Sequence, residues 1–393
     1  MKRFVYADNA ATTPVSREVI DAMAPIFSEH WGNPSSLHAK GREAKSLLDD
    51  ARARIARTLG CDASEIYFTS CGTESDNWAI RGAVSRMKAK GRTHIVTTKI
   101  EHHAVLHTCA ALEREGYTVT YVGVDEYGRV NMDELRAAVT EKTALVAVMY
   151  ANNEIGTIEP IAEIGAIAHE KGAWMFTDAV QAIGNIDIDL SKLPVDILAL
   201  SGHKIHAPKG IGALYIKRGV AITNLIEGGG QEKRRRGGTE NLPYAVGLAK
   251  AMEIATERIK DLPRVAKMRD RLIDGLTKIP YSKLNGHPTD RLAGNVNIGF
   301  EFIEGESLLL WLDIAGIAAS TGSACSSASL EPSHVLLATG VPHEKAHGSL
   351  RISITHETTD EDIDYILETV PPIVEKLRAM SPLWEDVVKG QNK

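Results

Sequence analysis

Between residue 64 and about residue 217, short apolar runs alternate with segments of helical periodicity, and this alternation restricts the fold more than any other feature. Strands that alternate with helices indicate βαβ crossovers and a mostly parallel sheet that is buried on both faces. The predicted strands are 66–69, 95–97, 119–124, 144–150, 174–177, 197–200 and 211–216. The predicted helices between them are 73–87, 103–115, 132–139 and 161–171.

The sequence beyond about residue 255 has a different pattern. Its predicted elements, in order, are a charged helical stretch broken at Pro263, two strands and a last helix, at 245–278, 295–299, 350–354 and 361–380. A length of 393 residues suits two domains. We therefore predict a large domain of residues 16–255 and a smaller α/β domain formed by residues 1–15 and 256–393.

Composition excludes several classes of protein. The 45 Lys and Arg are outnumbered by 51 Asp and Glu, whereas a dedicated nucleic-acid binder usually has a basic excess. Four cysteines are too few for a secreted disulfide scaffold. No apolar run reaches the ~18 residues of a membrane span, and the first residues lack a signal peptide's apolar stretch. We expect a soluble, cytoplasmic protein without direct nucleic-acid or membrane contacts.

Five polar clusters follow predicted strands. In an open α/β sheet, ligands bind outside the carboxyl ends of the strands, so these clusters are expected to form one site. They are residues 70–73, 101–102, 152–154, 178–181 and 201–204.

Lys204 and Asp178 stand at two of these strand ends. Lys204 is either a solvated loop lysine or a Schiff-base lysine, activated by partial burial and cationic neighbours. Asp178 either caps a turn or is a buried carboxylate, which is costly without a cationic partner. A pyridinium nitrogen is such a partner, and enzymes that use pyridoxal 5'-phosphate (PLP) combine a lysine and an aspartate in this way. The two residues together favour a PLP site.

The turn at residues 70–73 lies between a strand and a helix. Its backbone amides and the Thr73 hydroxyl meet the positive end of a helix dipole, which suits a phosphate group. An ordinary helix N-cap explains the same residues equally well. No Walker A motif follows, and the glycines at 228–230 do not form a dinucleotide-binding motif, so the sequence does not favour nucleotide binding.

The histidines at the start of the second predicted helix invite a metal interpretation. His103 and His107 are four residues apart, but no Glu stands between them as in HExxH and no third ligand is evident. We therefore predict no metal site. His102, at a strand end, is better placed to cover a ligand or to carry a proton.

Cys325 and Arg351 lie in the C-terminal part of the chain. Small residues surround Cys325 from 321 to 329 and cannot form a core, so we expect a mobile surface loop. An ordinary thiol, with a pKa of about 8.5, is only slightly ionised at neutral pH, so a reactive Cys325 requires local activation. Arg351 lies inside an apolar strand and requires a carboxylate partner, either internal or from a substrate. The basic run 233–236 is a surface patch, a solvated loop or a loop near an anionic cofactor.

Together these motifs resemble the cysteine desulfurases of the NifS/IscS type, within the class V aminotransferase family of PLP fold type I. The resemblance covers nearly the whole chain and depends on the order and spacing of short motifs. These motifs are residues 6–14, 32–36, 69–77, 101–102, 152–156, 178–181, 201–204, 238–241, 323–328 and 350–353.

The resemblance implies a PLP-dependent enzyme with a large domain, whose mainly parallel sheet is flanked by helices, and a smaller α/β domain. In this family pattern Lys204 holds PLP covalently and Asp178 pairs with the pyridine nitrogen. Gln181 contacts the phenolic oxygen, and His102 stacks on the ring and assists proton transfers. The residues implied to bind the phosphate are Gly72, Thr73, Ser201 and His203, with Thr239 reaching the phosphate of the other subunit in a homodimer.

The resemblance also implies the substrate and the reaction. Arg351, Asn153 and Asn33 bind the carboxylate of L-cysteine, with Asn153 also next to the cofactor. Cys325 is the nucleophile, which takes the sulfur as a persulfide and leaves L-alanine. The acceptor is a protein such as an iron–sulfur scaffold or a tRNA thiolation protein. The alternative is a selenocysteine lyase or another class V PLP enzyme, which does not need a thiol in a mobile loop.

Two positions depart from the family pattern. Cys71 stands where a glycine is usual in the phosphate-binding turn, and His356 follows the strand that carries Arg351. Neither departure is expected to change the core chemistry. The Ser-rich segment around Cys325 is similar to the family branch with a long, flexible catalytic loop.

Overall fold

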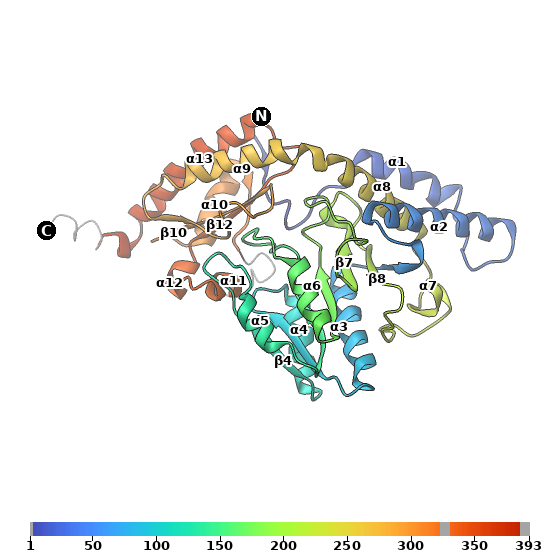
Figure 1. Cartoon of the computed structure of the whole chain (residues 1–393). Coiled ribbons are helices and arrows are strands. Elements are labelled where there is room, and N and C mark those ends of the chain that lie inside the picture. The colour runs from blue at the N-terminus through green and yellow to red at the C-terminus, as the bar shows by residue number, and fades with distance from the viewer. Residues whose placement is uncertain (1–2, 323–330, 386–393) are drawn as a thin grey trace.

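The computed structural model describes residues 3–322 and 331–385 (Figure 1). Its central element is a seven-stranded sheet with the spatial order β2 (Ile66–Thr69), β8 (Gly212–Ile216), β7 (Ile197–Ser201), β6 (Trp174–Asp178), β5 (Thr143–Ala147), β3 (His94–Thr98) and β4 (Thr118–Val122). The pairs from β7 to β4 are parallel, whereas β8 is antiparallel to both of its neighbours. The predicted mainly parallel sheet is therefore confirmed, with β8 as an antiparallel insertion.

Helices cover both faces of this sheet, because neighbouring strand residues point to opposite sides. On β6, Met175 belongs to one hydrophobic cluster and Phe176 to another. The Phe176 face packs against α3 (Gly72–Lys88) and α4 (His103–Arg114). The Met175 face packs against α1 (Arg17–Ser28), α2 (Ala39–Leu59), α5 (Met132–Ala138), α6 (Ile161–Glu170) and α8 (Leu242–Arg258).

A further hydrophobic cluster belongs to the C-terminal part of the chain. Its antiparallel sheet has the order β12 (Ser349–Ser353), β10 (Asn295–Phe300) and β9 (Ser282–Leu284). The helices α9 (Leu262–Leu276), α10 (Gly305–Ala315) and α13 (Asp360–Ala379) pack on this sheet, and α9 and α13 lie side by side in Figure 1. Pro263 lies in the first turn of α9, so the predicted helix break there is confirmed.

The N-terminal residues pack against the C-terminal part. The short strand β1 (Val5–Tyr6) pairs in parallel with β11 (Ile317–Ala318), and the backbone of Asn9 donates to the carbonyl of Ser353 at 3.3 Å. This pairing places the N-terminal residues next to the C-terminal part, as the predicted division into residues 16–255 and residues 1–15 with 256–393 requires. The boundaries themselves stay a prediction.

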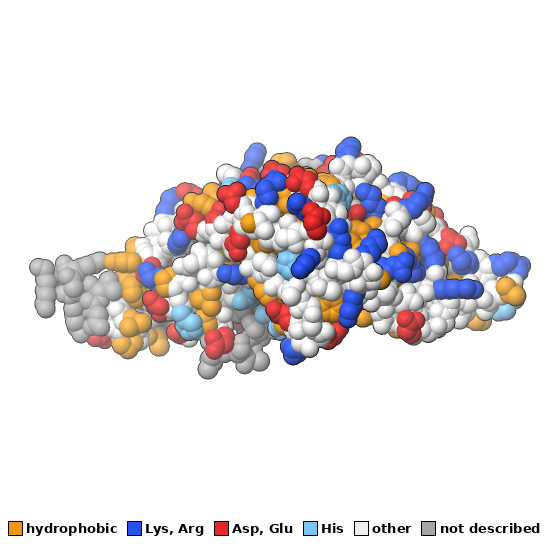
Figure 2. Space-filling view, turned by 60° about the horizontal axis from the view of Figure 1, so that its bottom comes forward, with side chains coloured by type: hydrophobic (Ala, Val, Ile, Leu, Met, Phe, Trp, Pro, Cys, Tyr) orange, Lys and Arg blue, Asp and Glu red, His pale blue; other side chains and the backbone are white. Residues whose placement is uncertain are grey.

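Two short helices, α11 (His334–Ala338) and α12 (His343–Ala346), pack against the end of the large sheet. Their Val335, Leu336 and Ala346 form a small cluster with Ile100 and Met149. Basic and acidic side chains are interspersed on the face shown in Figure 2, in line with the net charge of −6. Within the described ranges, no helix is both long and apolar enough to cross a membrane.

A buried ion pair fixes the short helix α7 (Gln231–Arg234) against the large sheet. Arg52 of α2 donates through both terminal nitrogens to the Glu232 carboxylate, each at 2.7 Å, and the two side chains are 6% and 3% exposed. Residues 232–234 have φ values of 44°, 59° and 64°, a left-handed conformation that costs about 1–3 kcal/mol per residue. The ion pair therefore holds strained backbone in place.

Replacing Glu232 with alanine leaves the Arg52 guanidinium buried and unpaired, so we expect unfolding to become easier by about 3–5 kcal/mol. Urea unfolding followed by circular dichroism measures this. The control is Glu253→Ala, which removes one carboxylate partner of Arg54, a second arginine of α2. Arg54 and Glu253 are both partly exposed, at 20% and 29%. That loss is expected to be about 1 kcal/mol or less. Equal losses in the two variants would contradict the structural role of the buried pair.

Candidate active site

A cavity of about 450 Å³ lies at the carboxyl ends of the parallel strands, a volume typical of small-molecule sites. All five predicted polar clusters contribute to its lining, so the expectation of one shared site is confirmed. The predicted site residues that line it are Gly72, Thr73, His102, Asn153, Asp178, Gln181, Ser201, His203, Lys204 and Arg351.

Lys204 reaches the cavity from a single 3₁₀ turn, Gly202–Lys204, that follows β7. Its Nζ donates to the carbonyls of Ala10 at 2.5 Å and Ala11 at 2.9 Å, so the N-terminal segment forms the wall beside the amine. The side chain is half-buried and lines the cavity. This position differs from that of a solvated loop lysine.

Asp178, the last residue of β6, brings a buried carboxylate to the cavity. Its Oδ1 accepts from the backbone N–H of Val180 at 2.9 Å. Burial raises the pKa of Asp178 to about 6, against this hydrogen bond and the charge of Lys204, which lower it. A cation in the cavity would stabilise the ionised form, and the protonated ring nitrogen of PLP is such a cation.

Asp76 is a cavity residue that the sequence interpretation missed. It lies in α3 and is buried, and burial followed by the charge of Asp178 raises its pKa well above the usual value. Among the described residues, none donates a hydrogen bond to its Oδ1. From sequence it resembles an ordinary first-turn acid, and its inward direction could only have been inferred from the helix face that it shares with Ala79 and Ala83.

The amino end of α3 and β7 together form a polar pocket that fits a phosphate group. Cys71 occupies the N-cap position with an extended backbone, φ −173°, and makes no side-chain cap bond, so the first amides of a 17-residue helix are directed to the cavity. The Oγ of Ser201 is buried and has no hydrogen-bond partner in the part of the chain that the structure describes. Burial lowers the pKa of His203 to about 4, which leaves a neutral imidazole here.

The basic run 233–236 ends next to this pocket. Arg236 donates to the two carboxylate oxygens of Glu74, at 2.8 and 3.1 Å, and Glu74 in turn accepts from the backbone of Ser70 at 2.8 Å. Of the interpretations left open by the sequence, the structure therefore supports a loop beside the candidate phosphate site.

His102 forms the N-cap of α4, where its Nδ1 accepts from the backbone N–H of Ala104 at 3.1 Å. Burial, together with the nearby charge of Lys204, lowers the pKa of His102 to about 4. The ring is thus neutral at physiological pH and can stack on a planar ligand or accept a proton. His103 and His107 stack nearby, at 5.0 Å between ring centroids, but residues 3–322 and 331–385 contain no group of side chains arranged to hold a metal ion.

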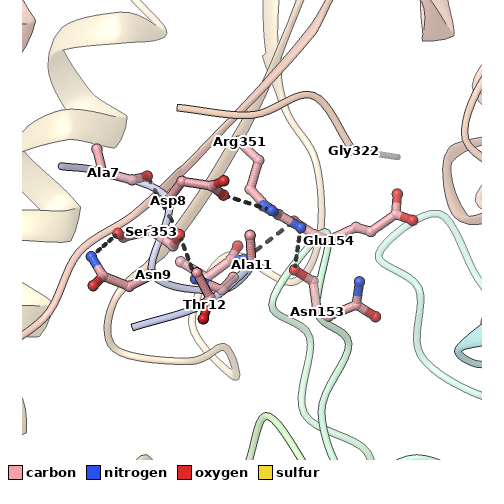
Figure 3. A network of polar contacts seen from close by, with 12 residues as sticks. Ala7, Asp8, Asn9, Ala11, Thr12, Asn153, Glu154, Gly322, Arg351 and Ser353 are labelled. Atoms are coloured by element: carbon pink, nitrogen blue, oxygen red, sulfur yellow. Dashed lines mark hydrogen bonds and ion pairs between the residues drawn. The ribbon is translucent and has the colours of Figure 1, made fainter. Parts of the chain in front are cut away.

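Arg351 enters the cavity from β12 of the smaller sheet (Figure 3). Its Nη2 donates to Asp8 at 2.8 Å and its Nη1 to the carbonyl of Asn153 at 3.3 Å. The sequence left open whether Arg351 meets an internal carboxylate or that of a substrate, and the structure provides the internal one, Asp8. Asp8 belongs to the motif at 6–14 but was not assigned a role from sequence, because 343 residues separate it from Arg351.

Three predicted site residues are not among those that line the cavity. Asn33 is exposed in the connection between α1 and α2, and Thr239 is exposed shortly before α8. The role predicted for Thr239 concerns a second subunit, which a single chain does not test. Cys325 lies outside the described residues, between Gly322 and Ser333.

Comparisons with known proteins agree with this geometry. The family model for class V aminotransferases matches residues 5–366. A protein of Methanosarcina thermophila named cysteine desulfurase IscS is 60% identical over 380 residues, which are 96% of this chain and 94% of that protein. A protein of the same name from Clostridium botulinum (strain Hall) is 53% identical over 398 residues and covers the whole of both chains.

Two solved structures are also similar. One, described as a NifS-like protein, has a TM-score of 0.90 and 40% identity and covers 95% of this chain and 100% of its own. The other, described as SspA in complex with cysteine, has a TM-score of 0.79 and 35% identity, with coverage of 90% and 99%. The chain therefore belongs to the class V aminotransferase family and has the fold of its PLP-dependent, fold type I members.

Proposed function

We propose that this protein is a cysteine desulfurase, which converts L-cysteine into L-alanine and an enzyme persulfide on Cys325. One observation carries the proposal above all others: Lys204, Asp178 and Arg351, from three separate elements, line one cavity. The names of relatives that are 50–60% identical support the same activity, and so does the similar structure described as a complex with cysteine.

The cavity residues fit PLP as the cofactor. Lys204 would hold it covalently, Asp178 would pair with its ring nitrogen and His102 would contact the ring. When bound, PLP supplies an electron sink for the electron pairs released at the substrate's carbon atoms. The residues proposed to complete its site are Gln181 and Asn153 at the ring and Gly72, Thr73, Ser201 and His203 at the phosphate, with Thr239 contributing to the site of the other subunit in a homodimer.

The protein's own groups bind the substrate and move its protons. Arg351 binds the substrate carboxylate, assisted by Asn153 and Asn33, while Asp8 keeps the guanidinium in place. Lys204 takes the proton from the α-carbon. His102 accepts and returns protons beside it, because burial keeps its imidazole neutral.

The sulfur is transferred by nucleophilic attack. The thiolate of Cys325 attacks the substrate sulfur, and the new S–S bond forms as the carbon–sulfur bond breaks. The electron pair of that bond stays with the β-carbon, which takes up a proton and becomes the methyl group of alanine. Sulfur is oxidised while carbon is reduced, so the step needs no outside oxidant.

The persulfide then passes its sulfur to an acceptor protein, such as an iron–sulfur scaffold or a tRNA thiolation protein. A cytoplasmic location stays a prediction. The alternative function, a selenocysteine lyase or another class V PLP enzyme, would use the same cavity. Only the requirement for Cys325 separates the two functions.

Lys204→Ala is expected to purify without the visible absorbance of the bound cofactor and to form no alanine, because the covalent attachment and the α-proton base are both lost. Absorbance spectra and an alanine assay measure this. Lys209→Ala, in which an exposed lysine five residues away is removed, is the matched control and should keep both. Alanine formation by Lys204→Ala would contradict the assignment.

Arg351→Lys is expected to raise the KM for cysteine about 5- to 150-fold, because an ammonium cannot bind a carboxylate with a planar fork. This range corresponds to about 1–3 kcal/mol for a charged hydrogen bond. Cofactor affinity should change much less, and steady-state kinetics with a cofactor titration measure both. A lower melting temperature with an unchanged KM would show that Arg351 serves only as the partner of Asp8.

Cys325→Ser is expected to bind cysteine, change its visible spectrum and then stall without forming alanine, because a neutral hydroxyl is a far weaker nucleophile than a thiolate. Rapid-mixing spectra alongside an alanine assay measure this. Cys61→Ser is the control, since burial raises the pKa of that thiol to about 12 and makes it inert. Near-normal alanine from Cys325→Ser would favour the lyase alternative.

A further inference from the structure

The connection between β5 and α6, residues 148–160, places two neighbouring side chains in different surroundings. Asn153 lines the cavity, and its carbonyl accepts from Arg351. Glu154 does not line the cavity and is buried, with 4% of its surface exposed. None of the steps of the proposed reaction uses this buried carboxyl group.

The Glu154 carboxyl contacts residues on both sides of the segment 323–330, namely Gly322 before it and Ser333 three residues after it. The Ser333 hydroxyl donates a hydrogen bond to Glu154 Oε2. On the other side, a Cβ added to Gly322 would lie 2.8 Å from the same Oε2, so the glycine backbone packs directly against the carboxyl. Figure 3 shows the Glu154 side chain extending from the Arg351 network toward Gly322.

In the part of the chain that the structure describes, the Ser333 hydroxyl donates its proton only to Glu154. Its Oγ already accepts from the backbone N–H groups of Val335 at 3.1 Å and Leu336 at 3.3 Å, as the N-cap of α11. Both lone pairs of the hydroxyl are thus occupied, and the proton is donated to Glu154. Removing that carboxyl would leave a buried donor unsatisfied, which costs about 1–3 kcal/mol.

The backbone of Glu154 is fixed by its own connection and by the smaller sheet. Its N–H donates to Asn152 Oδ1 at 2.8 Å. Its carbonyl accepts from Asn295 Nδ2 at 3.2 Å and Asn297 Nδ2 at 3.1 Å, and both of these asparagines belong to β10. The carboxyl therefore starts from a rigid point where the large and small sheets meet.

Burial raises the pKa of Glu154 to about 7, and the Ser333 hydrogen bond and the charge of Arg351 act against this rise. A carboxyl group in such surroundings costs folding energy that an apolar side chain would not. Its hydrogen bond with Ser333 is what an apolar replacement would lose.

We propose that Glu154 is a positioning residue for sulfur transfer: it fixes Gly322 and Ser333 against the cavity wall formed by Asn153 and Arg351, and so fixes where the segment carrying Cys325 joins the fold. The inference rests on the proposed function. Three peptide units separate Gly322 from Cys325 and span at most about 11 Å, so the position of Gly322 limits the reach of the thiol. Reacting atoms must approach to about 3–3.5 Å, and a 1 Å misplacement can cost about a hundredfold in rate.

The test separates two rates in single turnovers of the holoenzyme with L-cysteine. The change in the visible spectrum needs no thiol, whereas alanine formation requires Cys325. In Glu154→Ala we expect alanine formation to slow at least tenfold while the spectral change stays within threefold of the wild type. Glu154→Gln keeps an acceptor for Ser333 and should stay within threefold in both rates.

Glu159→Ala is the matched control. Glu159 lies in the same connection and is also buried, with its pKa raised to about 8 by burial, and it accepts from the backbone of Val130 at 3.0 Å. This variant should be less stable but keep the wild-type ratio of the two rates. A readout without turnover is the rate at which iodoacetamide alkylates Cys325, followed on its peptide by mass spectrometry. Glu154→Ala should change that rate at least threefold, and Glu159→Ala should leave it unchanged.

If Glu154→Ala does not fold, Ser333→Ala carries the same comparison, with Ser333→Thr expected to restore the wild-type ratio of rates. Equal slowing of both rates in Glu154→Ala, or an unchanged rate of alanine formation, would overturn the inference while leaving the proposed function intact. A wild-type enzyme that changes its spectrum with cysteine but forms no alanine would overturn the proposed function, and the positioning role with it.

Discussion

The buried guanidinium of Arg351 is the interaction on which the candidate site depends. It is 2% exposed, so it is stable only where polar partners surround it, and these partners come from parts of the chain that are far apart. Asp8 comes from the N-terminal segment and Asn153 from the connection after β5, whereas Arg351 itself comes from the smaller sheet. Satisfying one charge thus brings together the three segments that close the cavity, and the same N-terminal segment supplies the carbonyls that hold Lys204.

Burial also sets the electrostatics of the site. It raises the pKa of Asp178 and Asp76 and lowers the pKa of His102 and His203, so the cavity favours neutral side chains until a charged ligand enters. A cation next to Asp178 and an anion at the amino end of α3 both find groups directed toward them before they bind. Such an arrangement needs little reorganisation, and for this reason the residues fit a zwitterionic cofactor with a phosphate at one end.

Much of the fold could be predicted from sequence, because its signals are local. The apolar runs and helical periods located β2 to β8 and α3 to α6 to within a few residues, and Pro263 marked the start of α9. The antiparallel direction of β8 was not predicted, although residues 202–211 between β7 and β8 are too few for a crossover helix. Asp76 was missed because an acid near the start of a predicted helix has an adequate local explanation.

The sequence by itself determined which chemical groups stand at the strand ends, since a strand's length, its turn and the residue that follows are all encoded within a few positions. Lys204 and Asp178 could therefore be recognised without a structure. Only the tertiary structure decided that Arg351 pairs with Asp8 and that Glu154 contacts both Gly322 and Ser333, because 343 and up to 179 residues separate the members of these contacts. Local periodicity carries no information about such pairs. They form when two separate hydrophobic cores pack and bring distant polar groups to the same boundary.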